Sequence, residues 1–190
     1  MTFRNALLAA AMIAAPLAGA VPAAATLSEN FDSLASGTQT QFTDNGMIFS
    51  SPTDPGTFYV GSTGGLYNSL TGNALFSSSF TGATLDITFS QPETSVTLDF
   101  AIDDILAGVG DDTLSYATNT GATGTATSTL PPGAFYPEGV LTYTGAPFTS
   151  IAITSATEGF AVDNVAAPEP ASLGLLVVGV LGLAARRRRA

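Results

Sequence analysis

The chain has 190 residues, of which 45% are hydrophobic and only 11% are charged, and it contains neither cysteine nor histidine. Its five cations are Arg4 and the run at 186–189, while all fifteen carboxylates lie between them, from Glu29 to Glu169. The long stretch without cations excludes a nucleic-acid partner, since phosphate binding depends on Lys and Arg. The missing cysteine and histidine exclude disulfides, thiolate metal sites and a base-activated nucleophile.

The first 25 residues have the composition of a secretory signal peptide. Arg4 supplies the positive charge, an apolar run covers residues 6–15, and small residues stand at 18–20 and 23–25. A short positive region, an apolar centre of about 7–15 residues and an A-x-A site are the parts of such a peptide. Cleavage fits after Ala20 or after Ala25, and we favour Ala25 because Thr26 begins the folded pattern. The sequence therefore predicts an N-terminal signal helix over 1–25.

Residues 26–165 are predicted to form one all-β domain, an antiparallel β-sandwich of the jelly-roll kind. Apolar and polar residues alternate in Leu85–Phe89 and Val96–Ile102, which is the pattern of half-buried strands. Turn signals such as Asn45-Gly46 recur between the apolar runs. Further strand candidates lie at 47–49, 58–60, 114–116, 141–143, 151–153 and 160–162. Eight to ten short strands of this kind fit two packed sheets.

The two ends of this domain resemble the first and last strands of jelly-roll modules of the carbohydrate-binding and MAM-like type. The resemblance rests on Glu29-Asn30-Phe31-Asp32 and on the segment 160–165, which contains Asp163-Asn164. It implies that Glu29, Asp32 and Asp163 share a structural Ca²⁺, an ion that takes six to eight oxygen ligands. Alternation also predicts that Asp163 faces away from the core and is open to an ion. The alternative is that these carboxylates are caps and turn residues.

A second group of carboxylates, Asp103-Asp104 and Asp111-Asp112, brackets a glycine-containing segment. Its interpretations are solvated turn charge, a loop Ca²⁺ site, or the acid/base pair of a glycosidase. The last is disfavoured because adjacent strand residues point to opposite faces, whereas both carboxylates must flank one bond.

Threonines alternate with small residues near position 125. Such a row fits an exposed edge strand, or one row of an ice-matching surface, which needs several rows side by side. The residues concerned are Thr123, Thr125, Thr127 and Thr129.

The C-terminal segment 166–190 combines a short motif, an apolar stretch over 171–185 and a basic end. Fifteen helical residues span about 22 Å, against about 30 Å for a hydrocarbon core, so the predicted transmembrane helix is short. The arginines are expected on the cytoplasmic side. The motif and the basic end are Pro168, Glu169 and Pro170, followed by Arg186, Arg187, Arg188 and Arg189.

This tail resembles the PEP-CTERM sorting domain of Gram-negative bacteria. The resemblance implies recognition by exosortase, a membrane-embedded protease that processes the tail at or near the PEP motif. It also implies transient anchoring in the inner membrane, followed by delivery to the cell surface or the medium.

From these patterns we expect an exported, non-catalytic binding or structural component of the exopolysaccharide or biofilm matrix. Polysaccharide is the expected ligand, bound by exposed aromatic side chains. The alternative is a small secreted glycan-active enzyme that uses the carboxylates of residues 103–112. The tyrosines expected to contact sugar are Tyr59, Tyr67, Tyr136 and Tyr143.

Overall fold

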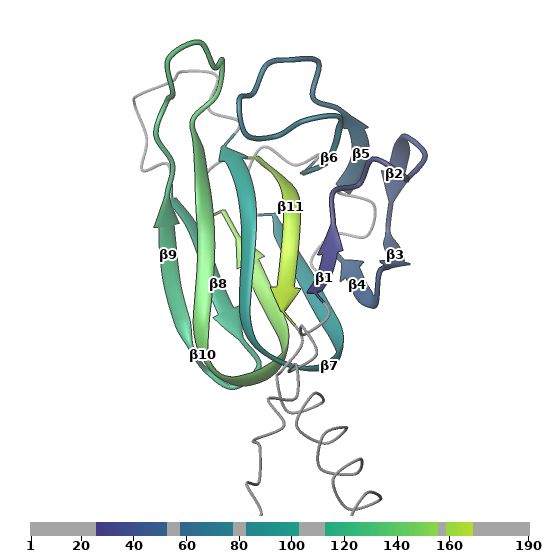
Figure 1. The fold of residues 1–190 in the computed structure, drawn as a ribbon, viewed down its shortest axis with the longest axis vertical. Coiled ribbons are helices and arrows are strands. Elements are labelled where there is room, and N and C mark those ends of the chain that lie inside the picture. Colours follow the sequence, from purple (N-terminus) through teal and green to yellow (C-terminus); the bar gives the residue numbers. More distant parts are fainter. Residues whose placement is uncertain (1–25, 53–57, 78–82, 103–112, 156–158, 169–190) are drawn as a thin grey trace, which may run out of the picture.

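The computed structural model describes residues 26–52, 58–77, 83–102, 113–155 and 159–168 (Figure 1). Within these ranges the chain forms strands and no helix, which confirms the predicted all-β class. The strands are β1 (Thr26–Glu29), β2 (Gly37–Gln39), β3 (Gln41–Asp44), β4 (Met47–Ser50), β5 (Phe58–Ser62), β6 (Asn73–Ser77), β7 (Thr84–Ile102), β8 (Thr113–Thr118), β9 (Thr123–Thr127), β10 (Glu138–Thr154) and β11 (Phe160–Pro168).

Two long strands, β7 and β10, run through both layers of a sandwich and join them (Figure 1). The second half of β7 pairs with β11 and the first half of β10. The first half of β7 pairs with β4, and the second half of β10 pairs with β8. One layer is therefore β2-β5-β6-β11-β7-β10, and β1 also pairs with β11. We call this layer the ridge sheet, after the row of aromatic side chains on its outer face that is described below. The other layer is β3-β4-β7-β10-β8-β9, the second sheet.

The length of β7 and β10 corrects the expected strand boundaries. The segments around Leu85–Phe89 and Val96–Ile102 were predicted as separate strands, but both belong to the 19 residues of β7. Likewise 141–143 and 151–153 both belong to the 17 residues of β10. Register shifts in β10 between Thr144 and Ser150 mark where the pair leaves one layer for the other. Such bulges sharpen the bend and twist of a strand.

The core lies between the two sheets, because each half of β7 sends alternate side chains into it. Leu85 and Ile87 come from the first half, Leu98 and Phe100 from the second, and none is more than 1% exposed. Burying a side chain of this size contributes about 1.5–3 kcal/mol. The period-2 pattern of the sequence is thus the pattern of a half-buried strand in each layer.

The ends of the domain lie side by side. β1 and β11 are antiparallel, and Thr26 is opposite Pro168 in the register. The last strand therefore continues three residues beyond Val165, the predicted end of the domain, and Ala167 is fully buried. The predicted signal helix, the transmembrane helix over 171–185 and the carboxylates at 103–112 lie outside the described residues. Among the residues that are described, no helix is long and apolar enough to cross a membrane.

Candidate functional site

The outer face of the ridge sheet carries a second, smaller apolar cluster. The register places Tyr59 of β5 beside Phe76 of β6, Phe76 beside Ala161 of β11, and Ala161 beside Ala101 of β7. The two alanines leave space above the sheet, and Leu70 of the β5–β6 loop fills it, only 1% exposed. The loop thus lies over the sheet instead of extending into solvent.

Five aromatic rings follow one another across this face, and we call them the aromatic ridge. Tyr59 stacks on Phe76 with centroids 5.2 Å apart, and Phe76 lies 6.1 Å from Tyr67. Tyr67 in turn stacks on Tyr136 at 5.3 Å, and Tyr136 meets Phe135 edge-on at 5.1 Å. Rings at these separations are in attractive contact. The ridge is therefore one continuous aromatic surface built from two strands and two loops.

The ridge exists because two loops, one between β5 and β6 and one between β9 and β10, pack together. The Phe135 amide donates to the Leu66 carbonyl at 2.9 Å, and the Asn68 side-chain amide reaches the Pro132 carbonyl at 3.4 Å. An open groove of about 300 Å³ runs beside them. Its lining residues are Asn68, Ser69, Pro131, Glu138, Gly139 and Val140.

Part of this surface faces solvent, which is unusual for large apolar side chains. Phe135 is 63% exposed and Tyr59 is 40% exposed. Leu66, Leu130 and Val140 are also exposed and come from the same loops or from the groove.

The ridge and the chain ends are at opposite ends of β11. Phe160 begins β11 near the ridge, and Pro168 ends it beside Thr26, so the strand leads from the ridge toward the chain ends. Nine strand residues span about 26 Å. The strand residues of the ridge therefore lie level with the first residues of β11, whereas residues 26 and 168 lie at the last one.

Three carboxylates hold the loop that carries Tyr67, and we call them the carboxylate clamp: Asp32, Glu138 and Asp163. Glu138 accepts the backbone amides of Asn68 and Ser69, each at 2.7 Å, and also the Ser69 hydroxyl. Asp163 accepts the amide of Thr71 at 3.0 Å, and Asp32 accepts that of Asn73 at 2.7 Å. Charged acceptors make stronger hydrogen bonds than neutral ones, so the clamp fixes residues 68–73 against the sheet.

The backbone next to Asp32 and Asp163 is irregular. Phe31 and Asn164 both have positive φ, at 59° and 50°, which is uncommon for residues other than glycine. Asn164 lies in a bulge, where the β11–β7 register shifts between Asp163 and Ala166. The Asn164 side chain donates to Asp99 at 2.9 Å. The segments 29–32 and 160–165 therefore contain irregular backbone, which places the Asp32 and Asp163 carboxylates within hydrogen-bond distance of the β5–β6 loop.

Asp163 is fully buried, which corrects the expectation that it is open to an ion. Alternation placed it correctly on the face opposite Val162, but the β5–β6 loop covers that face. The pKa of Asp163 is raised to about 6, chiefly by burial and further by the nearby Asp32 and Asp99 charges, against the amides of Thr71 and Asn164, which lower it.

The three residues predicted to share Ca²⁺ fall into two places. Asp32 and Asp163 are close enough to repel each other across the clamp, together with Asp99. Glu29 instead accepts the Phe31 amide and the Asn45 side-chain amide, and burial followed by the neighbouring Asp44 charge raises its pKa. Within the described ranges, no three carboxylates form a group suited to a metal ion. The calcium site stays a prediction.

Three of the four predicted tyrosines, Tyr59, Tyr67 and Tyr136, meet in the ridge. Tyr143 does not, because it is only 6% exposed in the core, where it contacts Phe148 and donates to the Ala146 carbonyl at 3.2 Å. Its position in the alternation of residues 141–143 already marks it as inward-facing. Sequence reasoning missed Phe76, Phe135 and Glu138. The adjacent aromatic residues Phe135 and Tyr136, in a segment rich in proline and glycine, are the one local sequence feature that indicates an aromatic surface there.

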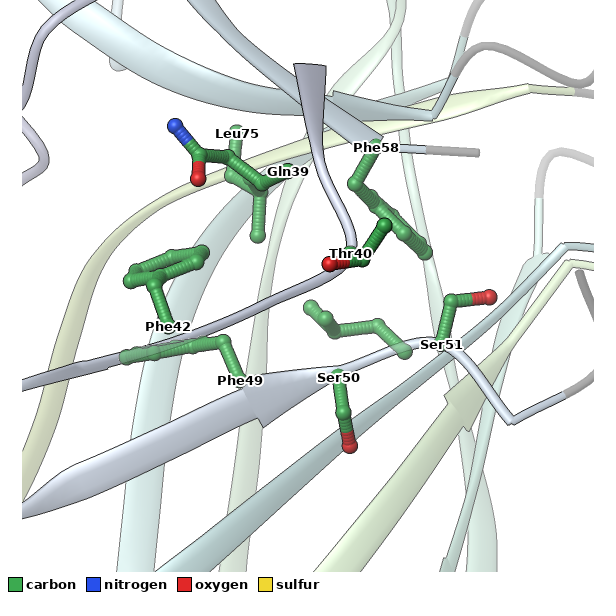
Figure 2. Close-up of a pocket in the computed structure, with 9 residues that line it drawn as sticks. Gln39, Thr40, Phe42, Phe49, Ser50, Ser51, Phe58 and Leu75 are labelled. Atoms are coloured by element: carbon green, nitrogen blue, oxygen red, sulfur yellow. The ribbon is translucent and has the colours of Figure 1, made fainter. Parts of the chain in front are cut away.

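The threonine row is an edge strand, as one of its two interpretations expected. Thr123, Thr125 and Thr127 are exposed on β9, which ends the strand order of the second sheet. A separate small pocket lies between the layers, where Phe42 stacks on Phe49 at 4.9 Å (Figure 2). Its volume of about 10 Å³ holds about one water molecule, so it is a packing gap and not a ligand site.

Comparison with protein families finds a PEP-CTERM protein-sorting motif over residues 166–189 of the chain. This motif implies an exported protein with a C-terminal membrane anchor before processing by exosortase. It covers the tail and says nothing about the β domain. Curated protein sequences give no match to the chain.

Solved structures resemble the β domain in fold. The K2 cleaved adhesin domain of Lys-gingipain is 13% identical, with a TM-score of 0.51 over 75% of this chain and 99% of that one. TmCBM61, solved with β-1,4-galactotriose, is 9% identical with a TM-score of 0.40 over 72% and 92%. A GH87 α-1,3-glucanase catalytic unit from Streptomyces thermodiastaticus is 15% identical with a TM-score of 0.40 over 77% and 26%. The first likeness is one of fold alone, and the other two carry no argument about ligand or activity.

Proposed function

We propose that this protein is delivered to the cell surface through its PEP-CTERM tail and binds exopolysaccharide there, without catalysis, through the aromatic ridge. The observation that supports the proposal is the continuous five-ring ridge beside an open groove whose lining includes the polar side chains of Asn68 and Ser69. The two loops that carry Tyr67, Phe135 and Tyr136 lie at the end of the domain away from the β1–β11 pairing of Thr26 and Pro168 (Figure 1). A ligand in the surrounding matrix would meet this end of a tethered domain first.

The chemistry of the ridge suits sugars because a pyranose ring has apolar C–H faces and a rim of hydroxyls. Aromatic rings cover the apolar face, and their rigid side chains lose little conformational entropy on binding. Polar groups beside such a platform orient the hydroxyls. Here the exposed Asn68 amide lies at the groove beside Tyr67.

The clamp prepares the ridge before any ligand arrives. Tyr67 precedes the clamped residues and Phe76 follows them, and the clamp bonds at Asn68 and Asn73 flank that segment. A site held in its binding conformation avoids the entropy cost of ordering a loop on association. The carboxylates thus act as positioning residues and not as ligands of the sugar.

The enzyme alternative has less support. A two-carboxylate mechanism requires two acidic groups on either side of the scissile bond. Among the residues that line the groove, Glu138 is the one carboxylate, and the loop backbone and Ser69 already occupy its oxygens. The carboxylates at 103–112 lie outside the described residues.

The test is to incubate the full chain, purified in detergent, with exopolysaccharide from the producing bacterium. We expect co-sedimentation with the polymer and no release of reducing ends. Phe135→Ala should strongly reduce co-sedimentation, whereas Thr125→Ala, which changes an exposed residue on the edge strand β9 and not a ring of the ridge, should not. Retention that is the same in both variants would contradict a ridge site, and release of reducing ends would favour the enzyme.

A further inference from the structure

We infer that the aromatic ridge and its groove take an uncharged glycan and discriminate against acidic ones such as polyuronates. This inference rests on the proposed function and narrows the class of its ligand. Its basis is the sign and the position of every charged side chain near the site.

No cation is available to receive an acidic sugar. Between Asn5 and Ala185 the sequence has no Lys, Arg or His, so every charged side chain in the domain is a carboxylate. Proteins recognise sugar carboxylates and sulfates with Arg and Lys, whose bonds to such groups are short and strong. The ridge has no such partner to offer.

Carboxylates also stand beside the place where a glycan would lie. Glu138 lines the groove, and Val140, which lines it too, is opposite Asp99 in the β7–β10 register. Asp99 is in turn opposite Asp163 in the β7–β11 register. A uronate in the groove would lie beside the Glu138 carboxylate, and like charges closer than the screening length of about 8 Å repel each other at physiological salt. Repulsion at that range penalises an acidic glycan and leaves a neutral one unaffected.

The remaining groups of the site are suited to neutral hydroxyls. The groove adds the side chains of Asn68 and Ser69 to the ridge, and Pro131, Gly139 and Val140 supply apolar or backbone surface. Amides and hydroxyls donate to and accept from sugar hydroxyls without needing a charge.

The experiment uses matched pairs of polymers: β-1,4-glucan, α-1,4-glucan and β-1,4-galactan, each beside its C6-oxidised polyuronate. Exopolysaccharide from the producing bacterium is added in native and carboxyl-reduced form. The full chain in detergent is run through native gels that contain each polymer. The buffer contains EDTA and salt at about 150 mM, the physiological ionic strength. Retardation measures binding. Phe135→Ala reports whether binding uses the ridge, and Thr125→Ala is the control.

We expect at least one neutral polymer to retard the protein, its oxidised partner to bind about tenfold or more weakly, and Phe135→Ala to lose about tenfold in affinity. Ridge-dependent binding of a polyuronate as tight as that of its neutral partner in EDTA would overturn the inference and leave the proposed function standing. Polyuronate binding that appears only when Ca²⁺ replaces EDTA would overturn it as well. If no polymer retards the protein, or if the ridge instead holds two copies together in sedimentation, the proposed function fails too.

Discussion

Thr26 and Pro168 are opposite each other in the antiparallel pairing of β1 and β11. The first is the residue after the favoured signal cleavage site, and the second is the first residue of the PEP motif. The β1–β11 pairing therefore closes the domain at the end nearest its membrane-sorting segment. It also separates the motif into a proline that belongs to the sheet and two residues, Glu169 and Pro170, that follow it.

This separation sharpens the prediction about delivery. Deleting residues 168–170 should leave export intact and trap the protein in the inner membrane, but it also removes a residue of β11. Glu169→Ala leaves the sheet complete and removes only the acidic residue of the motif. We expect this variant to remain in the inner-membrane fraction, measured by cell fractionation and by mass spectrometry of the C-terminus. Normal arrival at the surface or in the medium would contradict the sorting role of the motif.

Substitution of Gly72 tests whether the Asp32 carboxylate of the clamp contributes to stability. Its φ is +67°, and a Cβ there would clash with the Asp32 carboxylate oxygen that accepts the Asn73 amide. Gly72→Ala must displace Asp32 and strain the backbone, so we expect a loss of about 2–4 kcal/mol in the free energy of unfolding. Gly121→Ala is the matched control, since its φ is +89° with nothing within 4 Å, and it should cost about 1 kcal/mol. Equal losses in denaturant unfolding would argue against the clamp.

The raised pKa of Asp163 predicts that the domain becomes less stable as pH rises. Its pKa is about 6 in the folded state against an ordinary 3.8, so between these values the folded state holds more protons than the unfolded state. The stability linked to this proton is complete below the unfolded value and is lost as pH rises through about 6. The loss is about 3 kcal/mol. The pKa values of buried Glu29 and half-buried Asp86 are also raised, so both groups act in the same direction.

The measurement is denaturant unfolding in EDTA at several values between pH 4 and pH 7.5. Wild type should be most stable near the acidic end, and Asp163→Asn should remove most of the slope between pH 4 and pH 6. A variant with the same slope as wild type would mean that Asp163 is ionised throughout.

Calcium binding is the prediction that the resemblance of the domain ends suggested. An ion that binds only the folded state adds about 2.7 kcal/mol at a hundredfold excess over Kd. The comparison is millimolar Ca²⁺ against monovalent salt of equal ionic strength, because screening alone relieves repulsion among carboxylates. We expect Asp163→Asn to lose the calcium-dependent rise in Tm and Asp112→Asn to keep it. The reverse result would move the site to residues 103–112, and an unchanged Tm in wild type would remove it.

Local pattern was enough to predict which segments become strands, since alternation at Leu85–Phe89 and Val96–Ile102 reports burial on one face. It was not enough to predict that these segments form one strand. Whether a strand stops or bends into a second layer depends on the partners it finds there, β4 for one half of β7 and β11 for the other. Those partners lie far away in the sequence.

The candidate site shows the same limit. Tyrosines in loops were a sound indication of surface aromatics, and Tyr59, Tyr67 and Tyr136 do meet. Their meeting depends on the bond between the Leu66 carbonyl and the Phe135 amide, which no local pattern encodes. Alternation likewise predicted correctly that Asp163 lies on the face of β11 opposite Val162. It did not predict the burial of Asp163, because the covering loop contains Thr71, which lies 92 residues earlier in the chain and donates its amide to Asp163.

The five tyrosines of the chain report directly on whether the ridge is the surface that contacts glycan. Ring-labelled tyrosine gives one NMR signal per residue, three from the ridge and two, Tyr116 and Tyr143, from rings that contact each other at the core. On titration with exopolysaccharide from the producing bacterium, the signals of Tyr59, Tyr67 and Tyr136 should shift together while those of Tyr116 and Tyr143 stay in place. Binding of the polymer with the three ridge signals unmoved would contradict the ridge as the glycan-binding surface.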